Sequence, residues 1–163
     1  CFAFQSVTAV TDWNAKQQFT LFGTCQFMFK SNRTIEDRKK AVMRFWNAVD
    51  RTIYTAKEIA TEGKRVERIV YLEQGRSRDY VHFHFFCKAN NPTQLKTLIN
   101  TTQHFWNNKV EDTQTLDIKL NQNSDYRDGY GIKEYEAICF DDNRNFKTEI
   151  SNEQIFLECC HLT

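Results

Sequence analysis

Two short apolar segments in the middle of the chain constrain its fold most. Residues 68–73 read Arg-Ile-Val-Tyr-Leu-Glu and residues 81–86 read Val-His-Phe-His-Phe-Phe, with a polar stretch containing Gly75 between them. Segments of this length, rich in β-branched and aromatic residues and separated by a short turn, predict two strands that pair as a hairpin. Because side chains alternate along a strand, His82 and His84 are expected on one face and Phe83 and Phe85 on the other.

The chain before the hairpin predicts a strand followed by a long helix. Residues 11–18 form a polar lead-in, helical or irregular, and the strand lies within residues 19–30. The helix begins at Asn32 or Thr34, either of which can cap it, and ends at Gly63. Its apolar residues recur at a spacing of three and four, as in an amphipathic helix.

The chain after the hairpin adds a second helix, capped by Asn90 or Asn91, and a fourth strand at residues 115–120. The order strand, helix, strand, strand, helix, strand is that of the split βαβ, or ferredoxin-like, arrangement. The sequence therefore predicts an α+β fold in which helices flank a central antiparallel sheet. A short helix over residues 130–137 and a packing helix over residues 150–157 complete the prediction.

Composition sets limits on the class of protein. The 163 residues, 40% hydrophobic and 14% aromatic, supply a core for one domain over residues 1–163. The formal net charge of +1 is low for a protein that coats duplex DNA. No segment is long enough for a membrane span, so no membrane association is expected. The six cysteines are irregularly spaced, and Cys25 and Cys87 lie in apolar strands, which indicates buried thiols in a reducing cytoplasm.

The hairpin is also the candidate metal site. Glu73 ends the first strand, nine residues before His82, and strand pairing brings its carboxylate towards His82 and His84. Two imidazoles and one carboxylate form a mixed site with open positions that suits Mn²⁺ or Mg²⁺ and favours Mn²⁺. The alternative is a pair of ordinary sheet histidines beside an unrelated surface Glu73. Arginines 65, 68, 76 and 78 crowd around these strands, either to face a ligand or as solvated surface charge.

A third motif follows about forty-six residues after His84, where Tyr130 precedes Lys133 by three positions. The order of an apolar strand bearing Thr24, a carboxylate with His-x-His, and Tyr-x-x-Lys resembles the HUH endonucleases, specifically the single-tyrosine rolling-circle replication initiators (Rep proteins). The resemblance covers about residues 19–140. Its first motif, residues 22–29, is a poorer match to the family's Thr-Leu-Thr pattern.

The resemblance implies a DNA endonuclease and strand transferase that nicks and joins single-stranded or hairpin DNA at a replication origin. Tyr130 is the implied nucleophile, Lys133 a charge-stabilising residue, and Glu73, His82 and His84 the ligands of Mn²⁺ or Mg²⁺. Host replication machinery is a candidate partner. The expected location is the bacterial cytoplasm or the host compartment in which the replicon is copied.

Several alternatives stay open. Tyr126 and Tyr135 lie near Tyr130, although neither has a lysine at the third following position. In the related single-tyrosine transposases a polar residue in the place of Glu134 completes the metal site. A non-catalytic ferredoxin-like nucleic-acid-binding domain could stack bases on outward aromatics such as Tyr80 or Phe86, although core packing is the usual role of sheet aromatics. A mononuclear oxygenase would also use two histidines and one carboxylate.

Overall fold

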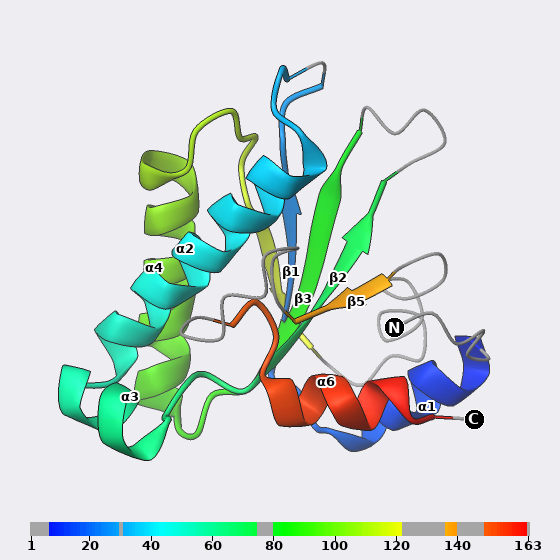
Figure 1. Ribbon diagram of the computed structural model, residues 1–163. Helices are drawn as coiled ribbons and strands as arrows, with labels where there is room; N and C mark the ends of the chain where they lie inside the picture. The colour runs from blue at the N-terminus through cyan, green and yellow to red at the C-terminus, as the bar shows by residue number, and fades with distance from the viewer. Residues whose placement is uncertain (1–6, 30, 75–79, 122–135, 140–148, 163) are drawn as a thin grey trace.

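The computed structural model describes residues 7–29, 31–74, 80–121, 136–139 and 149–162 (Figure 1). Its centre is a five-stranded antiparallel sheet with the strand order β4-β1-β3-β2-β5. The strands are β1 (Leu21–Gln26), β2 (Arg68–Glu73), β3 (His82–Cys87), β4 (Asp117–Leu120) and β5 (Glu136–Ile138). The described helices are α1 (Val7–Lys16), α2 (Ile35–Ile53), α3 (Ala56–Glu62), α4 (Pro92–Lys109) and α6 (Glu153–Cys160).

The predicted α+β, ferredoxin-like arrangement is confirmed. Helix α2 connects β1 to β2, α4 connects β3 to β4, and the first four strands lie in the order β4-β1-β3-β2. Strand β5 extends this sheet at the free edge of β2. The fifth strand corrects the prediction of a helix over residues 130–137, because residues 136–138 are extended and pair with β2. Within the described residues, no helix is both long and apolar enough to cross a membrane.

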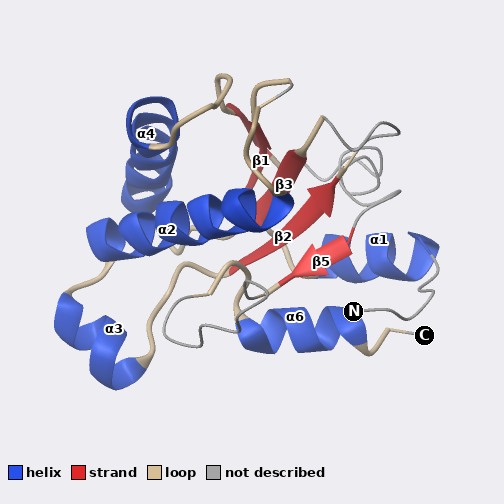
Figure 2. Cartoon of the chain, turned by 45° about the horizontal axis from the view of Figure 1, so that its top comes forward, coloured by secondary structure: helices blue, strands red, loops and turns tan. Residues whose placement is uncertain are grey.

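Helices cover both faces of the sheet (Figure 2). On one face, α2 and α4 pack over a large core in which Trp46 meets Phe85 edge to face, with ring centroids 5.0 Å apart. On the other face, α1 and α6 cover a smaller core that contains Trp13, Tyr71 and Phe86. Phe86 is fully buried there, which excludes the outward, base-stacking role considered for it. Buried apolar surface on both faces fixes the strands that carry the candidate site.

The predicted long helix is in fact two helices. Thr34, not Asn32, caps α2 through a capping box with Asp37, and the helix ends at Ile53, after which Tyr54 is extended. Thr55 then caps α3 through a second capping box with Glu58, and Gly63 ends α3 with a positive φ of 64°. Each capping box satisfies backbone N–H groups that a helix start leaves without partners, so the second one favours a new helix start at Ala56.

The second predicted helix, α4, begins after Asn91, one of the two residues predicted to cap it. Asn91, not Asn90, caps α4 by accepting a hydrogen bond from the backbone N–H of Gln94, and Pro92 takes the first helical position.

The thiols of Cys25 and Cys87 are buried within β1 and β3, as predicted. Burial raises the pKa of Cys87 to about 12, so this thiol stays protonated and serves as core packing.

Candidate metal centre

The backbone of the β2–β3 hairpin brings the three predicted ligands together. Glu73 pairs directly with His82 across the two strands, and the next inward residue of that face on β3 is His84. Residues directly opposite on antiparallel strands project from the same face, so all three side chains stand on one side of the sheet. Phe83 and Phe85 point into the opposite core, as the strand alternation predicted.

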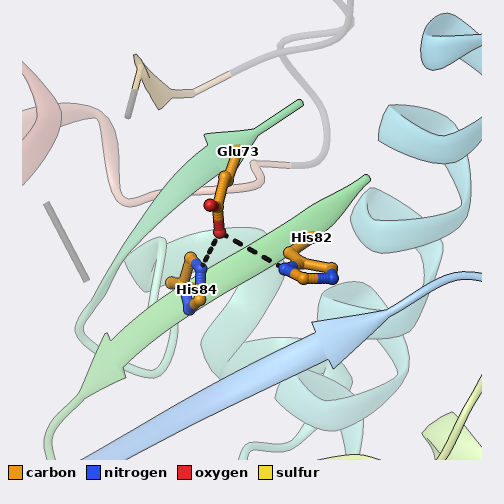
Figure 3. Close-up of side chains that lie close together, drawn as sticks. All are labelled: Glu73, His82 and His84. Atoms are coloured by element: carbon orange, nitrogen blue, oxygen red, sulfur yellow. Dashed lines mark hydrogen bonds and ion pairs between the residues drawn. The ribbon is translucent and has the colours of Figure 1, made fainter. Parts of the chain in front are cut away.

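The imidazoles of His82 and His84 both approach one carboxylate oxygen of Glu73 (Figure 3). Oε2 of Glu73 lies 2.8 Å from Nε2 of His84 and 3.3 Å from Nδ1 of His82. All three ligand atoms lie within 4.8 Å of one another. His82 and His84 on β3 and Glu73 on β2 therefore form a compact cluster, as the sequence predicted.

The orientation of His84 is fixed from its other side. Nδ1 of His84 lies 3.1 Å from the hydroxyl oxygen of Thr24, which pairs with His84 across β1 and β3. The ring of Phe22 stacks on the imidazole, with an angle of 5° between the ring planes and 5.9 Å between centroids. Because each ring nitrogen has its own partner, the imidazole directs Nε2 towards Glu73. Such a second contact is typical of metal-binding histidines.

The local electrostatics favour the protonation states that a metal needs. The pKa of Glu73 is lowered, mainly by its hydrogen bond with His84, and this outweighs the opposing effect of partial burial. The pKa of His82 is lowered because burial penalises the imidazolium, despite the nearby carboxylate. At neutral pH the cluster therefore presents an ionised carboxylate and a neutral His82. A cation needs both forms, because protons compete with it for the same atoms.

The separations are also compatible with a shared metal ion. Adjacent ligands of an octahedral ion, bound at about 2.1 Å, are about 3 Å apart. The two oxygen-to-nitrogen distances of 2.8 and 3.3 Å lie on either side of this value. The side chain of Glu73 is 26% exposed and that of His84 3%, so the cluster opens to solvent on the carboxylate side. Glu73, His82 and His84 therefore form a group that could hold a metal ion.

His82 differs from His84 in its surroundings. Its Nε2 atom is buried and has no hydrogen-bond partner within the described part of the chain. The ring of Tyr80 packs against it edge to face, with centroids 4.4 Å apart. His82 therefore contacts the Glu73 carboxylate through Nδ1, while the aromatic ring of Tyr80 packs against its imidazole.

The structure revises one expectation about the charges near these strands. The Arg68 side chain is fully buried and forms an ion pair with Asp50, and Arg65 also lies 3.4 Å from Asp50. Neither arginine is therefore a surface charge directed at the site. Arg76 and Arg78 lie outside the described residues.

The residues predicted to complete an active site fall in a part of the chain that the structure does not describe. Tyr130, Lys133, Glu134 and the alternative tyrosines Tyr126 and Tyr135 all lie there.

The described strand that follows them begins beside the cluster. Glu136, the first residue of β5, pairs with Leu72, the neighbour of Glu73. Tyr130 precedes Glu136 by six positions, which limits its distance from that residue to about 20 Å.

Two features were not predicted from the sequence. Thr24 was noted as part of an apolar strand motif, and its contact with His84 follows only from the β1–β3 register. Phe29 is 52% exposed, just beyond the end of β1. Its signal was the run Phe27-Met28-Phe29, because three consecutive apolar residues cannot all face the same side of a strand.

Comparisons with protein-family models, curated proteins and solved structures give no match to the chain, so the case for its function rests on the site itself.

Proposed function

We propose that this chain is a metal-dependent endonuclease that nicks and rejoins single-stranded DNA, of the kind that initiates rolling-circle replication. The observation that carries the proposal is the Glu73–His82–His84 cluster on adjacent strands of a ferredoxin-like sheet. A bound Mn²⁺ or Mg²⁺ would neutralise charge on the non-bridging oxygens of a phosphodiester. The substrate would be a single strand or an extruded hairpin at a replication origin, in the compartment where the replicon is copied.

The nucleophile in this proposal is Tyr130. Its phenolate oxygen attacks the phosphorus, the bond from phosphorus to the 3′ oxygen breaks, and that oxygen takes up a proton to leave as a 3′-hydroxyl. The 5′ end of the DNA remains esterified to Tyr130, so the reverse reaction can rejoin the strand without another energy source. Lys133 would stabilise negative charge in the transition state.

Two observations support the assignment of this nucleophile. Tyr130 is tethered six residues before β5, and β5 begins opposite Leu72, next to the ligand Glu73. The carboxylate side of the cluster is also the side that opens to solvent, so a phosphate has access to it. The proposed nucleophile therefore belongs to the segment that precedes a strand paired with β2, the strand that ends at Glu73.

A nicking assay with ligand variants tests the proposal. A single-stranded oligonucleotide that carries the replicon's origin sequence is incubated with the protein in Mn²⁺, Mg²⁺ or EDTA, and the products are separated on a denaturing gel. Cleavage is expected with either metal and not in EDTA. His82→Ala, His84→Ala and Glu73→Gln should each abolish cleavage and Mn²⁺ binding measured by calorimetry, because each removes one ligand.

The matched control for the histidine variants is His104→Ala, which removes an exposed histidine on α4. It should bind Mn²⁺ and cleave as the wild type does. Cleavage at the wild-type rate in EDTA, or by the His82→Ala/His84→Ala double variant, would rule out metal-dependent nicking at this cluster.

A further inference from the structure

Among the residues that the structure describes, most aromatic side chains are buried, and two exposed ones meet beside the candidate metal centre. Phe29 is 52% exposed and Tyr80 36% exposed. Within the described residues, no other aromatic side chain is as exposed as these two. Phe29 follows β1 and Tyr80 precedes β3, so the two come from neighbouring strands of the sheet. We call Phe29 and Tyr80 the aromatic platform.

The aromatic platform is continuous with a metal ligand. The ring centroids of Phe29 and Tyr80 lie 6.1 Å apart, and those of Tyr80 and His82 lie 4.4 Å apart. Nδ1 of His82 in turn lies 3.3 Å from the Glu73 carboxylate. A row of three rings therefore leads from the metal centre to the protein surface.

This arrangement calls for a ligand with two different parts. The metal centre would bind an anionic oxygen of the ligand. The aromatic platform would contact a flat, apolar group of the same ligand that lies next to this oxygen. Stacking on an aromatic ring is favourable for any nucleobase, because every base has a π face. In a duplex those faces are already stacked on neighbouring bases, so a base in an unpaired strand is the group that can use the platform.

We infer that the aromatic platform stacks one base of single-stranded DNA, next to the phosphate that lies at the metal centre. This inference rests on the proposed function and adds a base of the DNA strand as a group that the protein binds. Stacking needs no metal and no base sequence, so the aromatic platform supplies binding that persists without a cation and that is tolerant of sequence. It also positions the strand, because a base held at Tyr80 keeps its phosphate near His82.

The test compares two ligands of equal length by fluorescence anisotropy in EDTA, where no cleavage is expected. One is a fluorescein-labelled single-stranded oligonucleotide, and the other is the same sugar-phosphate chain with abasic positions throughout. Tyr80→Leu and Phe29→Leu keep an apolar side chain but remove the ring. Each should weaken binding of the ordinary oligonucleotide roughly tenfold and leave binding of the abasic chain unchanged.

Two controls separate stacking from indirect effects. Leu157→Ala truncates an apolar side chain of similar exposure, 42%, on α6 and away from the aromatic platform, and it should bind both ligands as the wild type does. Calorimetry with Mn²⁺ should give the same affinity for Phe29→Leu and for the wild type, because Phe29 is separated from His82 by the Tyr80 ring.

Each result has a defined meaning. If Phe29→Leu and Tyr80→Leu bind the ordinary oligonucleotide as tightly as the wild type, the aromatic platform is wrong and the metal-dependent nicking proposal is untouched. Equal losses for the ordinary and the abasic chains would also overturn it, because the rings would then act without the bases. If the selective loss is seen but the wild type cuts no DNA, the platform stands and the nicking proposal falls.

Discussion

The hydroxyl of Thr24 lies 3.1 Å from Nδ1 of His84 and joins strand β1 to the candidate metal centre. This contact connects an apolar strand near the start of the chain with a ligand sixty residues later. It fixes the imidazole so that Nε2 faces the Glu73 carboxylate at 2.8 Å. Thr24 is therefore a positioning residue for the candidate metal site.

Replacing Thr24 by valine should weaken metal binding without disturbing the fold. Valine has the shape of threonine and a high strand propensity but cannot form the hydrogen bond to His84. Loss of a contact of this kind typically lowers metal affinity by a factor of about ten to a hundred. Calorimetric titration of Mn²⁺ measures the change, and Thr24→Ser, which keeps the hydroxyl, should retain most of the affinity. Equal Mn²⁺ affinity in Thr24→Val and the wild type would show that Thr24 does not position His84.

The buried ion pair between Asp50 and Arg68 should be the most sensitive polar contact of the fold. Both side chains are fully buried, and Asp50 also accepts a hydrogen bond of 2.9 Å from the backbone N–H of Val66. Arg68 donates to the carbonyl oxygens of Ile150 and Glu149, so it attaches the segment before α6 to the sheet.

Asp50→Ala should therefore lower the free energy of unfolding by about 3–5 kcal/mol, because it leaves the Arg68 charge buried without its counter-ion. Urea denaturation followed by circular dichroism measures the loss. The comparison is Arg33→Ala, which breaks exposed ion pairs with Glu111 and Asp112 and should change stability little. Equal stability losses in the two variants would contradict this assignment.

Helix α3 should loosen in acid because its cap depends on an ionised carboxylate. The hydrogen bond from the backbone N–H of Thr55, followed by those from Lys64 and the Thr55 hydroxyl, lowers the pKa of Glu58 to about 2. A carboxyl group whose pKa is lower in the folded than in the unfolded chain stabilises the fold above the ordinary pKa of about 4.5, and this contribution is lost as the pH falls from there towards 2.

Hydrogen exchange of the α3 amides, followed by NMR between pH 5 and 2, measures this effect. Protection of the α3 amides, corrected for the intrinsic pH dependence of exchange, should fall over that range relative to the amides of α2. In Glu58→Gln, which cannot ionise, protection should start lower and change less. A parallel pH dependence in the wild type and in Glu58→Gln would show that Glu58 is not responsible.

The candidate metal site could be predicted from the sequence because it depends on local rules. His82 and His84 share a face through strand alternation, and a short turn places Glu73 opposite them. The Thr24 contact could not be predicted in the same way, because it depends on which strand lies beside β3. That neighbour is set by packing of residues far apart in the chain.

The errors in the predicted fold have similar causes. The Thr55-x-x-Glu58 capping box was present in the sequence, but the apolar spacing of α2 continues as far as Ile53 and Tyr54 and concealed the break. Strand β5 has three residues and exists because the edge of β2 is available to pair with it, so local propensity did not reveal it. Arg68 was grouped with surface charges because its partner, Asp50, lies on a different element.

A search for a covalent bond between DNA and Tyr130 tests the proposed nicking reaction most directly. The protein is incubated with Mn²⁺ and an origin-containing single strand, denatured in SDS and digested with trypsin, and the peptide that carries DNA is identified by mass spectrometry. We expect an SDS-resistant adduct that contains the 3′ fragment of the strand on the Tyr130 peptide, absent in Tyr130→Phe and formed more slowly in Lys133→Ala. Cleavage at the wild-type rate by a variant with phenylalanine at positions 126, 130 and 135 would contradict it, because the nucleophile would then be none of these tyrosines.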